Sequence, residues 1–290
     1  MNDFLYLKGK MSGWGPFEQV SSNTLIFSMG NPCEGHGPAL SPDNDSRCAN
    51  FVAYHVSERS GAKFVAHIPY TTDQVGDIAL DWSPAYIPME ECVNKCVDYI
   101  EYHCKILQEL GIDFSRILII NGHGGNYGVD KFSIWGEFKT EFRLSDLIFV
   151  NTYEVNVEEF LRSQNYSNET RNAYLTAVHT GGHADTIEHS IATLYGGVDY
   201  GKLNKMNNFI IKNGTEAALR KWPVLGGLGG YLKFGGEQYE PLRKVGLERC
   251  LKQFEEDGQI FLFPELAQIV MEHLIKRISG MIENFTTRKR

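Results

Sequence analysis

The chain has 290 residues and a formal net charge of −8 at pH 7, with 42% hydrophobic and 22% charged residues. These fractions are close to the average for soluble globular chains, so the composition argues against disordered, collagen-like and coiled-coil classes. Lys and Arg form no block before the last three residues, and the sequence therefore predicts no nucleic acid and no membrane among the partners. We expect small molecules and further copies of this chain instead.

Cysteine usage and hydropathy indicate the compartment. The six cysteines form no Cys-x-x-Cys pair, and the first ten residues lack the apolar stretch of a signal peptide. Every apolar run is shorter than the ~18–20 residues that span a bilayer. These features predict a cytoplasmic protein with reduced thiols.

Four short apolar runs have the pattern of strands that are buried on both faces, as in a parallel sheet. These runs are residues 24–29, 63–68, 116–120 and 147–150. Segments with helical periodicity alternate with them, at residues 45–60, 88–110 and 131–144. Gly111 suits the position just after the end of the second helix. We predict an α/β fold, a three-layer sandwich in which helices cover both faces of a mostly parallel central sheet.

The second half of the chain is less regular. One helix is predicted to begin near Glu188, and a long C-terminal helix covers residues 263–285, with Pro264 in its first turn. Between them, residues 225–236 are so rich in glycine that we predict a loop or a lid. No internal repeat or low-complexity linker divides the chain, so we predict a single domain over residues 1–290.

Polar residues follow the first predicted strand, and in open α/β sheets the ligand crevice lies at the carboxyl ends of the strands. Glu34 and His36 are two residues apart, so in an extended segment they point the same way and can bind adjacent metal ions. Asp45 opens the next helix, where a carboxylate can bridge two cations and also suits the helix N-terminus. Taken alone, the segment also fits a turn in which Glu34 and His36 are solvated and Asp43 or Asp45 is a helix cap.

His123 follows the third predicted strand directly, within the sequence Asn-Gly-His-Gly-Gly-Asn. Glycines on both sides of the imidazole let the backbone approach a ligand closely. The alternative is an ordinary strand-to-helix turn around a core histidine.

A third cluster brings His183 and Glu188 together at a predicted helix start, where Asp185 and Glu188 taken alone fit acidic residues of a first turn. The three clusters together supply a mixed set of histidine and carboxylate side chains, namely Glu34, His36, Asp45, His123 and Glu188. Such a set is typical of sites that hold a pair of Zn²⁺, Mn²⁺ or Fe²⁺ ions.

The three motifs, in this order, resemble those of the creatininase family of binuclear-metal amidohydrolases. The family's usual first motif, E-x-H-G-P-H-L-P-L-D-T-D, is matched at Glu34, His36, Gly37, Pro38, Leu40, Asp43 and Asp45. Its usual third motif, H-A-G-E-x-E-T-S, is matched at His183, Ala184, Glu188 and Ser190. The resemblance spans roughly residues 24 to 195.

The resemblance implies a creatininase-like domain, usually assembled as a homo-oligomer, a hexamer, with two divalent metal ions at the strand ends. Glu34 and His123 would hold one ion, His36 and Glu188 the other, and Asp45 would bridge them. In creatininase a Glu two residues after the second-motif histidine is a ligand, and that position is Gly125 here. Glu188 is our candidate for the missing ligand.

The resemblance also assigns a catalytic role and leaves the substrate open. His183 matches the histidine thought to move protons at the reacting amide. Trp82 and Tyr86 lie where the chain departs from the family, and they either stack on a planar ring or form an aromatic loop or subunit contact. Asn121 and Asn126 either orient the substrate or hold their loop.

These residues predict a metal-dependent hydrolase that cleaves the C–N bond of a cyclic or linear amide through a metal-bridged hydroxide. His183 would donate the proton that the departing nitrogen needs. Two other substrates fit the family, the formamide of a formylaminopyrimidine nucleotide and a cyclic keto-sugar opened by water. A non-catalytic metal-binding sensor subunit is an alternative from another functional class. A nucleotide-binding protein with 225–236 as its phosphate loop is disfavoured, because no GxxxxGK[ST] motif is present.

Overall fold

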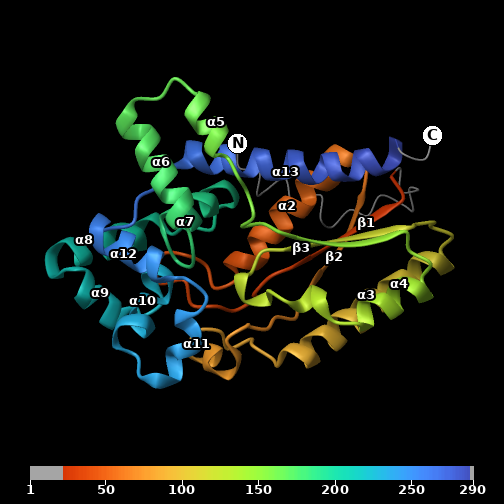
Figure 1. The fold of residues 1–290 in the computed structure, drawn as a ribbon, viewed down its shortest axis with the longest axis horizontal. Helices are drawn as coiled ribbons and strands as arrows, with labels where there is room; N and C mark the ends of the chain where they lie inside the picture. Colours follow the sequence, from red (N-terminus) through yellow and green to blue (C-terminus); the bar gives the residue numbers. More distant parts are fainter. Residues whose placement is uncertain (1–21, 288–290) are drawn as a thin grey trace. The chain divides into compact units, whose positions relative to one another are not determined.

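A computed structural model describes residues 22–287 of the chain (Figure 1). The first ten residues, where we expect no signal peptide, and the basic last three lie outside the described residues. Internal contacts divide the described chain into two compact units. The first comprises residues 22–33, 45–155 and 271–287, and the second comprises residues 34–44 and 156–270. A single domain over residues 1–290 stays a prediction.

The first unit is built on a four-stranded sheet. Its strands are β1 (Thr24–Met29), β2 (Lys63–Ile68), β3 (Arg116–Asn121) and β4 (Asp146–Asn151). They are all parallel and lie in the order β2-β1-β3-β4. β1 and β3 are buried along their whole length, and because neither face meets water their sequences show no polar alternation. The four predicted strands agree with the structure to within a residue at each end.

Helices cover both faces of this sheet. They are α2 (Asn44–Ser60), α3 (Met89–Glu109), α4 (Ile134–Glu141) and residues 271–287 of α13 (Pro264–Thr287). Figure 1 shows α3 and α4 on one side of the strands, with α2 and α13 on the other. The α/β three-layer fold predicted from the sequence is therefore confirmed.

A hydrophobic core lies between the sheet and α3. Phe27 and Ile119 of the central strands pack with Cys92, Cys96 and Ile100 of the helix, all of them at most 1% exposed. The apolar residues of α3 recur at three and four residues, and this spacing makes one face of a helix apolar. The helix ends at Glu109, and Gly111 follows the C-cap residue Leu110 as predicted, with a φ of +72° that suits glycine.

The second unit is helical. Its helices are α5 (Glu158–Ser163), α6 (Asn168–Thr180), α7 (Thr186–Ala192), α8 (Tyr200–Asn213), α9 (Thr215–Lys221), α10 (Leu225–Phe234), α11 (Glu240–Arg243) and α12 (Glu248–Asp257), followed by the start of α13. Residues 34–44 belong to this unit because Leu40 forms an antiparallel bridge with Val198 and Ser41 N–H donates to Gly197 O at 3.3 Å. The helix predicted near Glu188 is α7, and the C-terminal helix is α13.

The glycine-rich segment differs from the loop that its composition predicts. Residues 225–230 are buried, and α10 runs through the segment with a kink at Gly226, Gly227 and Leu228, whose φ values are 60–70°. A Cβ at Gly226 would lie 2.9 Å from Phe254, and one at Gly227 would lie 2.8 Å from Cys250. The glycines are present because α12 packs directly against the backbone of α10. The prediction of an irregular loop is therefore wrong here, and a lid motion stays a prediction.

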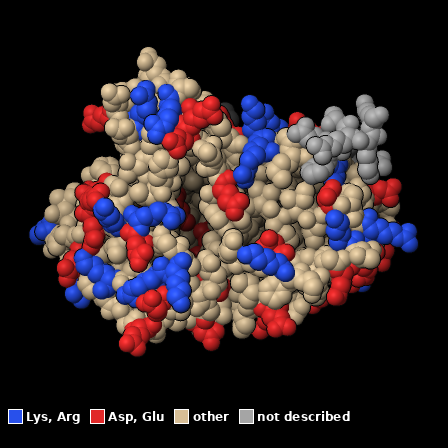
Figure 2. All heavy atoms as spheres, in the orientation of Figure 1, with Lys and Arg blue, Asp and Glu red and all other residues tan. Residues whose placement is uncertain are grey.

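Charged side chains of both signs are interspersed on the face shown in Figure 2.

Among residues 22–287, no helix is both long enough and apolar enough to cross a bilayer.

Candidate functional site

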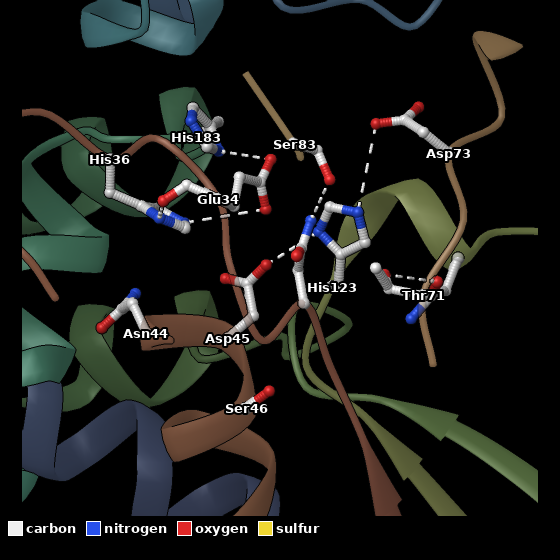
Figure 3. Close-up of polar contacts among 12 residues, drawn as sticks. Glu34, His36, Asn44, Asp45, Ser46, Thr71, Asp73, Ser83, His123 and His183 are labelled. Carbon is white, nitrogen blue, oxygen red and sulfur yellow. Dashed lines mark hydrogen bonds and ion pairs between the residues drawn. The ribbon is translucent and has the colours of Figure 1, made fainter. Parts of the chain in front are cut away.

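Two predicted ligands meet at the topological switch point of the first unit. The chain passes from β1 to β2 on one side of β1 and then returns from β2 to β3 on its other side, so the strand order reverses at β1 and β3. In such sheets the crevice lies at the carboxyl ends of these two strands. Asp45 is in the first turn of α2, and His123 follows β3. Both are buried, and His123 Nδ1 lies 2.7 Å from Asp45 Oδ2 (Figure 3).

The turn that carries His123 is held by two asparagine side chains. Asn121 Oδ1 accepts hydrogen bonds from His123 N–H at 3.1 Å and Asn126 Nδ2 at 3.0 Å, while Asn121 Nδ2 donates to His123 O at 2.8 Å. Asn126 Oδ1 accepts from Thr71 Oγ1 and Thr72 N–H. Both amides are 3% exposed. Of the two predicted roles for Asn121 and Asn126, the geometry supports holding the loop.

Asp73 is a site residue that the sequence analysis misses. Its Oδ2 lies 4.0 Å from His123 Nε2, on the side of the ring away from Asp45 (Figure 3). Burial raises the pKa of the Asp73 carboxyl, and the nearby His123 partly opposes this rise. No motif marks Asp73, because its place depends on how the loop after β2 packs against the turn after β3.

The aromatic residues expected to stack on a substrate lie beside Asp73. Trp82 is buried, and its side chain partly opposes the rise in the Asp73 pKa that burial causes. Tyr86 O–H donates to Asp77 Oδ1 at 3.1 Å. Stacking of Trp82 or Tyr86 on a substrate stays a prediction.

The second unit brings four predicted residues together. His36 Nε2 lies 3.2 Å from Glu188 Oε1 and 3.9 Å from Glu34 Oε2, and His183 Nδ1 lies 3.4 Å from Glu34 Oε1. Glu34, His36 and His183 each offer a ligand atom within 4.8 Å of the other two, an arrangement that could hold a metal ion. Glu34 and His36 are nearly fully buried rather than solvated. The interpretation of this segment as an exposed turn is therefore wrong.

Backbone carbonyls set the tautomers of the two histidines. His36 Nδ1 lies 3.2 Å from Glu34 O, and His183 Nε2 lies 2.7 Å from Gly35 O. A carbonyl oxygen only accepts, so His36 carries its proton on Nδ1 and His183 carries its proton on Nε2. In the neutral rings, the nitrogens that face the carboxylates are then the ones with a lone pair, as metal binding or proton transfer requires.

Glu188 is fixed by the start of α7. Asp185 caps the helix by accepting from Glu188 N–H at 2.9 Å, and burial raises the pKa of Asp185 to about 7. Ala184, at φ +51°, turns its N–H toward Glu188 Oε2, while Asn44 Nδ2 donates to Glu188 Oε1 at 2.9 Å. An alanine in the left-handed region costs energy, and such strain concentrates at functional sites. Glu188 therefore faces His36 and is not a solvated first-turn acid.

No family model matches the chain. A segment of 101 residues is 33% identical to the 2-amino-5-formylamino-6-ribosylaminopyrimidin-4(3H)-one 5'-monophosphate deformylase of Methanobrevibacter ruminantium, covering 35% of this chain and 39% of that protein. A deformylase of the same name from Methanococcus maripaludis is 29% identical over 126 residues, 43% of this chain and 50% of that protein. The chain thus spans half or less of the length of these curated relatives.

Solved structures resemble nearly the whole chain. A crystal structure of creatinine amidohydrolase (creatininase) matches with a TM-score of 0.54 and 15% identity, over 98% of this chain and 95% of that one. A structure named creatininase Mn gives a TM-score of 0.54 at 14% identity, over 98% and 96%. A mutant creatininase of Zn–Zn type gives 0.52 at 14% identity, over 91% of each chain. The chain has the creatininase fold. The resemblance predicted from the three motifs is thereby confirmed.

One departure from the creatininase motifs now has a physical cause. A Cβ at Gly125 would lie 2.8 Å from Asp73 Oδ2 and closer still to His123 Nε2, so no side chain fits at this position. Position 125 therefore offers no carboxylate in this chain. Glu188, 3.2 Å from His36, stays our candidate for the missing ligand, as a prediction.

Proposed function

We propose that this chain is a metal-dependent hydrolase that cleaves a non-peptide C–N bond in a cyclic or linear amide. The observation that carries the proposal is the buried cluster of Glu34, His36 and His183 with Glu188 beside it. Buried carboxylates and imidazoles at 3–4 Å are costly unless they are paired or bind a cation. The imidazole and carboxylate donors fit Zn²⁺, Mn²⁺ or Fe²⁺.

Each unit contributes its own ligands in this proposal. Asp45 and His123 are the metal ligands of the first unit, and Glu34, His36 and Glu188 are those of the second. Two bound divalent ions would lower the pKa of a bound water toward ~7 and polarise the scissile carbonyl. The creatininases named as Mn and Zn–Zn types support two divalent ions without deciding which metal is native to this chain.

His183 is the proposed proton donor. Because Gly35 O fixes its Nε2–H, the opposite nitrogen, Nδ1, faces Glu34 and can receive and return a proton. At 13% side-chain exposure, His183 is also more accessible than Glu34 or His36, as a residue that meets a substrate must be. The leaving nitrogen of an amide needs such a proton before the C–N bond breaks.

The second candidate substrate is the formamide of a formylaminopyrimidine nucleotide. It is favoured by the named deformylases, whose identity of 29–33% over 101–126 residues exceeds the 14–15% of the creatininases. A creatinine-like lactam is favoured by the fold over the whole chain. Opening of a cyclic keto-sugar and a non-catalytic sensor role remain alternatives to be tested in the same experiment.

The test combines metal analysis with a hydrolysis screen. Protein purified without chelator is expected to carry about two divalent ions per chain and to hydrolyse one of three probes: creatinine, a formylaminopyrimidine nucleotide or a cyclic keto-sugar. His123→Ala is expected to lose metal and activity together, because a methyl group cannot replace an imidazole ligand. Full hydrolysis by metal-free wild type would refute the proposal, while metal binding without turnover would favour the sensor. Light scattering of the same sample tests the proposed homo-oligomer, which the resemblance implies to be a hexamer. The cytoplasmic location stays a proposal.

A further inference from the structure

The start of α2, which carries Asp45 and Ser46, lies directly against the ends of two central strands (Figure 3). A Cβ at Gly30, just after β1, would lie 2.7 Å from the carbonyl carbon and oxygen of Asp45. A Cβ at Gly122, just after β3, would lie even closer to the same oxygen. Neither position has room for a side chain, so glycine is required at both for the helix to begin here. These backbone contacts set how closely the first turn of α2 approaches the sheet.

A chain of side-chain hydrogen bonds fixes the same helix from β2. His67 pairs with Ser28 of β1 in the sheet, and His67 Nδ1 lies 2.9 Å from Ser28 Oγ. On α2, Asn50 Oδ1 lies 2.6 Å from Ser28 Oγ. The other ring nitrogen, His67 Nε2, lies 3.0 Å from Ser46 Oγ, on the residue that follows Asp45. The chain therefore joins β1 and β2 to two points of α2 that are about one helical turn apart.

The chemistry of these groups sets the direction of each bond. An amide oxygen only accepts, so Ser28 donates its one proton to Asn50 and accepts the Nδ1 proton of His67. In the neutral ring Nε2 is then the nitrogen with the lone pair, and Ser46 donates its O–H to it. Ser28 and Ser46 are both buried, where such bonds are stronger than in water. Ser46 therefore needs an acceptor at this point of β2, and the imidazole supplies it.

We propose that His67 is a positioning residue for Asp45, which acts through Ser46 by fixing the rotation of the first turn of α2 about the helix axis. The inference rests on the proposed metal-dependent function, in which Asp45 is a ligand. Asp45 and Ser46 are consecutive residues of one helical turn, so a rotation that moves one of them moves the other. Metal sites tolerate ligand displacements of only about 0.2 Å, and a small rotation is therefore enough to weaken binding.

The decisive variant is Ser46→Ala, which removes the hydroxyl that His67 holds. The matched control is Ser57→Ala in the same helix, because Ser57 Oγ donates to Ala62 O at 2.7 Å and lies about 18 Å along α2 from Asp45. Each variant loses one side-chain hydrogen bond of α2. We expect Ser46→Ala to bind Zn²⁺ about tenfold more weakly in chelator competition, the lower end of the usual cost of losing a group that orients a metal ligand. Ser57→Ala is expected to bind Zn²⁺ as wild type does, and equal affinities in the two variants would overturn the inference.

A double-mutant cycle tests whether His67 acts through Ser46. His67→Phe keeps a ring of similar size and removes both nitrogens. If the two residues act as one unit, His67→Phe alone and the double variant with Ser46→Ala are each expected to lose about tenfold in Zn²⁺ affinity. A loss of about a hundredfold in the double variant would show that the two act separately, and this would overturn the inference. Should His67→Phe fail to fold, the comparison of Ser46→Ala with Ser57→Ala decides alone.

A third measurement needs no metal. In the metal-free protein the His123 ring donates to Asp45 at 2.7 Å, and the proton resonance of that ring N–H reports the strength of the bond. We expect this resonance to shift in Ser46→Ala and to stay at its wild-type position in Ser57→Ala. An unchanged resonance in a folded Ser46→Ala protein would overturn the inference. If wild type binds no metal, the proposed function fails, and the resonance still decides whether Ser46 and His67 hold Asp45 in place.

Discussion

Two neighbouring glycines of the His123 turn offer a sharp test of the first unit's site. In Gly125→Ala the new Cβ would lie 2.8 Å from Asp73 Oδ2 and even closer to the imidazole, whereas in Gly124→Ala it would meet nothing within 4 Å. Neither glycine has a positive φ, so both backbones accept alanine. The pair therefore isolates the effect of one methyl group that points at His123 and Asp73.

The expected magnitude follows from the contact distances. Ordinary contacts of a Cβ begin near 3.4 Å, so Asp73 must retreat by about 0.6 Å and the His123 ring by more. Crowding of this kind costs about 1–3 kcal/mol of unfolding free energy. Metal sites tolerate ligand displacements of only about 0.2 Å, so we also expect Zn²⁺ affinity to fall at least tenfold in Gly125→Ala.

Urea unfolding of the metal-free proteins measures the first effect, and chelator competition measures the second. Gly124→Ala is expected to match or slightly exceed wild type in stability, because alanine restricts the unfolded chain. If Gly125→Ala equals Gly124→Ala in both assays, the packing of Asp73 and His123 described here is wrong.

Three further predictions concern the second unit. His183→Asn is expected to keep its metal content and lose about 10²–10⁴-fold in kcat, while His179→Asn, at an exposed histidine of α6, leaves kcat unchanged; equal turnover in both would remove His183 from the chemistry. Metal analysis is expected to find one bound ion in Glu188→Gln and two in the control Glu169→Gln, which changes an exposed first-turn acid of α6. Two ions in both variants would show that Glu188 is not the missing ligand. Burial lowers the pKa of His189 to about 4, so the folded state binds fewer protons than the unfolded state below pH 6.5, and stability is lost as the pH falls from 6.5 toward 4. From pH 7 to pH 5, the unfolding free energy of metal-free wild type, measured with urea, is expected to fall by about 2 kcal/mol relative to that of His189→Gln. A difference between the two proteins that does not change with pH would contradict a buried neutral imidazole.

The strands and the helices of the first unit are predictable because their signals are local. A strand buried on both faces is a continuous apolar run, and α3 repeats apolar residues at helical spacing, so their bounds follow within one or two residues. The same kind of signal exists for α8, where Leu203, Met206 and Ile210 recur at three and four residues. α10 is different, because its glycines serve contacts with α12 that composition alone cannot distinguish from a loop.

The site shows the same division between local and non-local information. Motifs mark Asp45 and His123 of the first unit and four residues of the second, and within each unit the structure brings the marked residues together. The four residues of the second unit are Glu34, His36, His183 and Glu188. Asp73 carries no motif, since its meeting with His123 joins loops 50 residues apart in the chain. The sequence leaves the roles of Asn121 and Asn126 open for the same reason, because their partners lie on another loop and another strand.

The order of the strands has a consequence for how the chain is made. Leu25 of β1 pairs with Lys63 of β2, 38 residues further on, but Thr24 pairs with Arg116 of β3, which is 92 residues further on. At ~5–20 residues per second of synthesis, the apolar strand β1 waits about 5–18 s for its second neighbour. During that interval one edge of a strand that is destined to be central remains open to other chains. The crevice that holds Asp45 and His123 is therefore assembled only after this edge has closed.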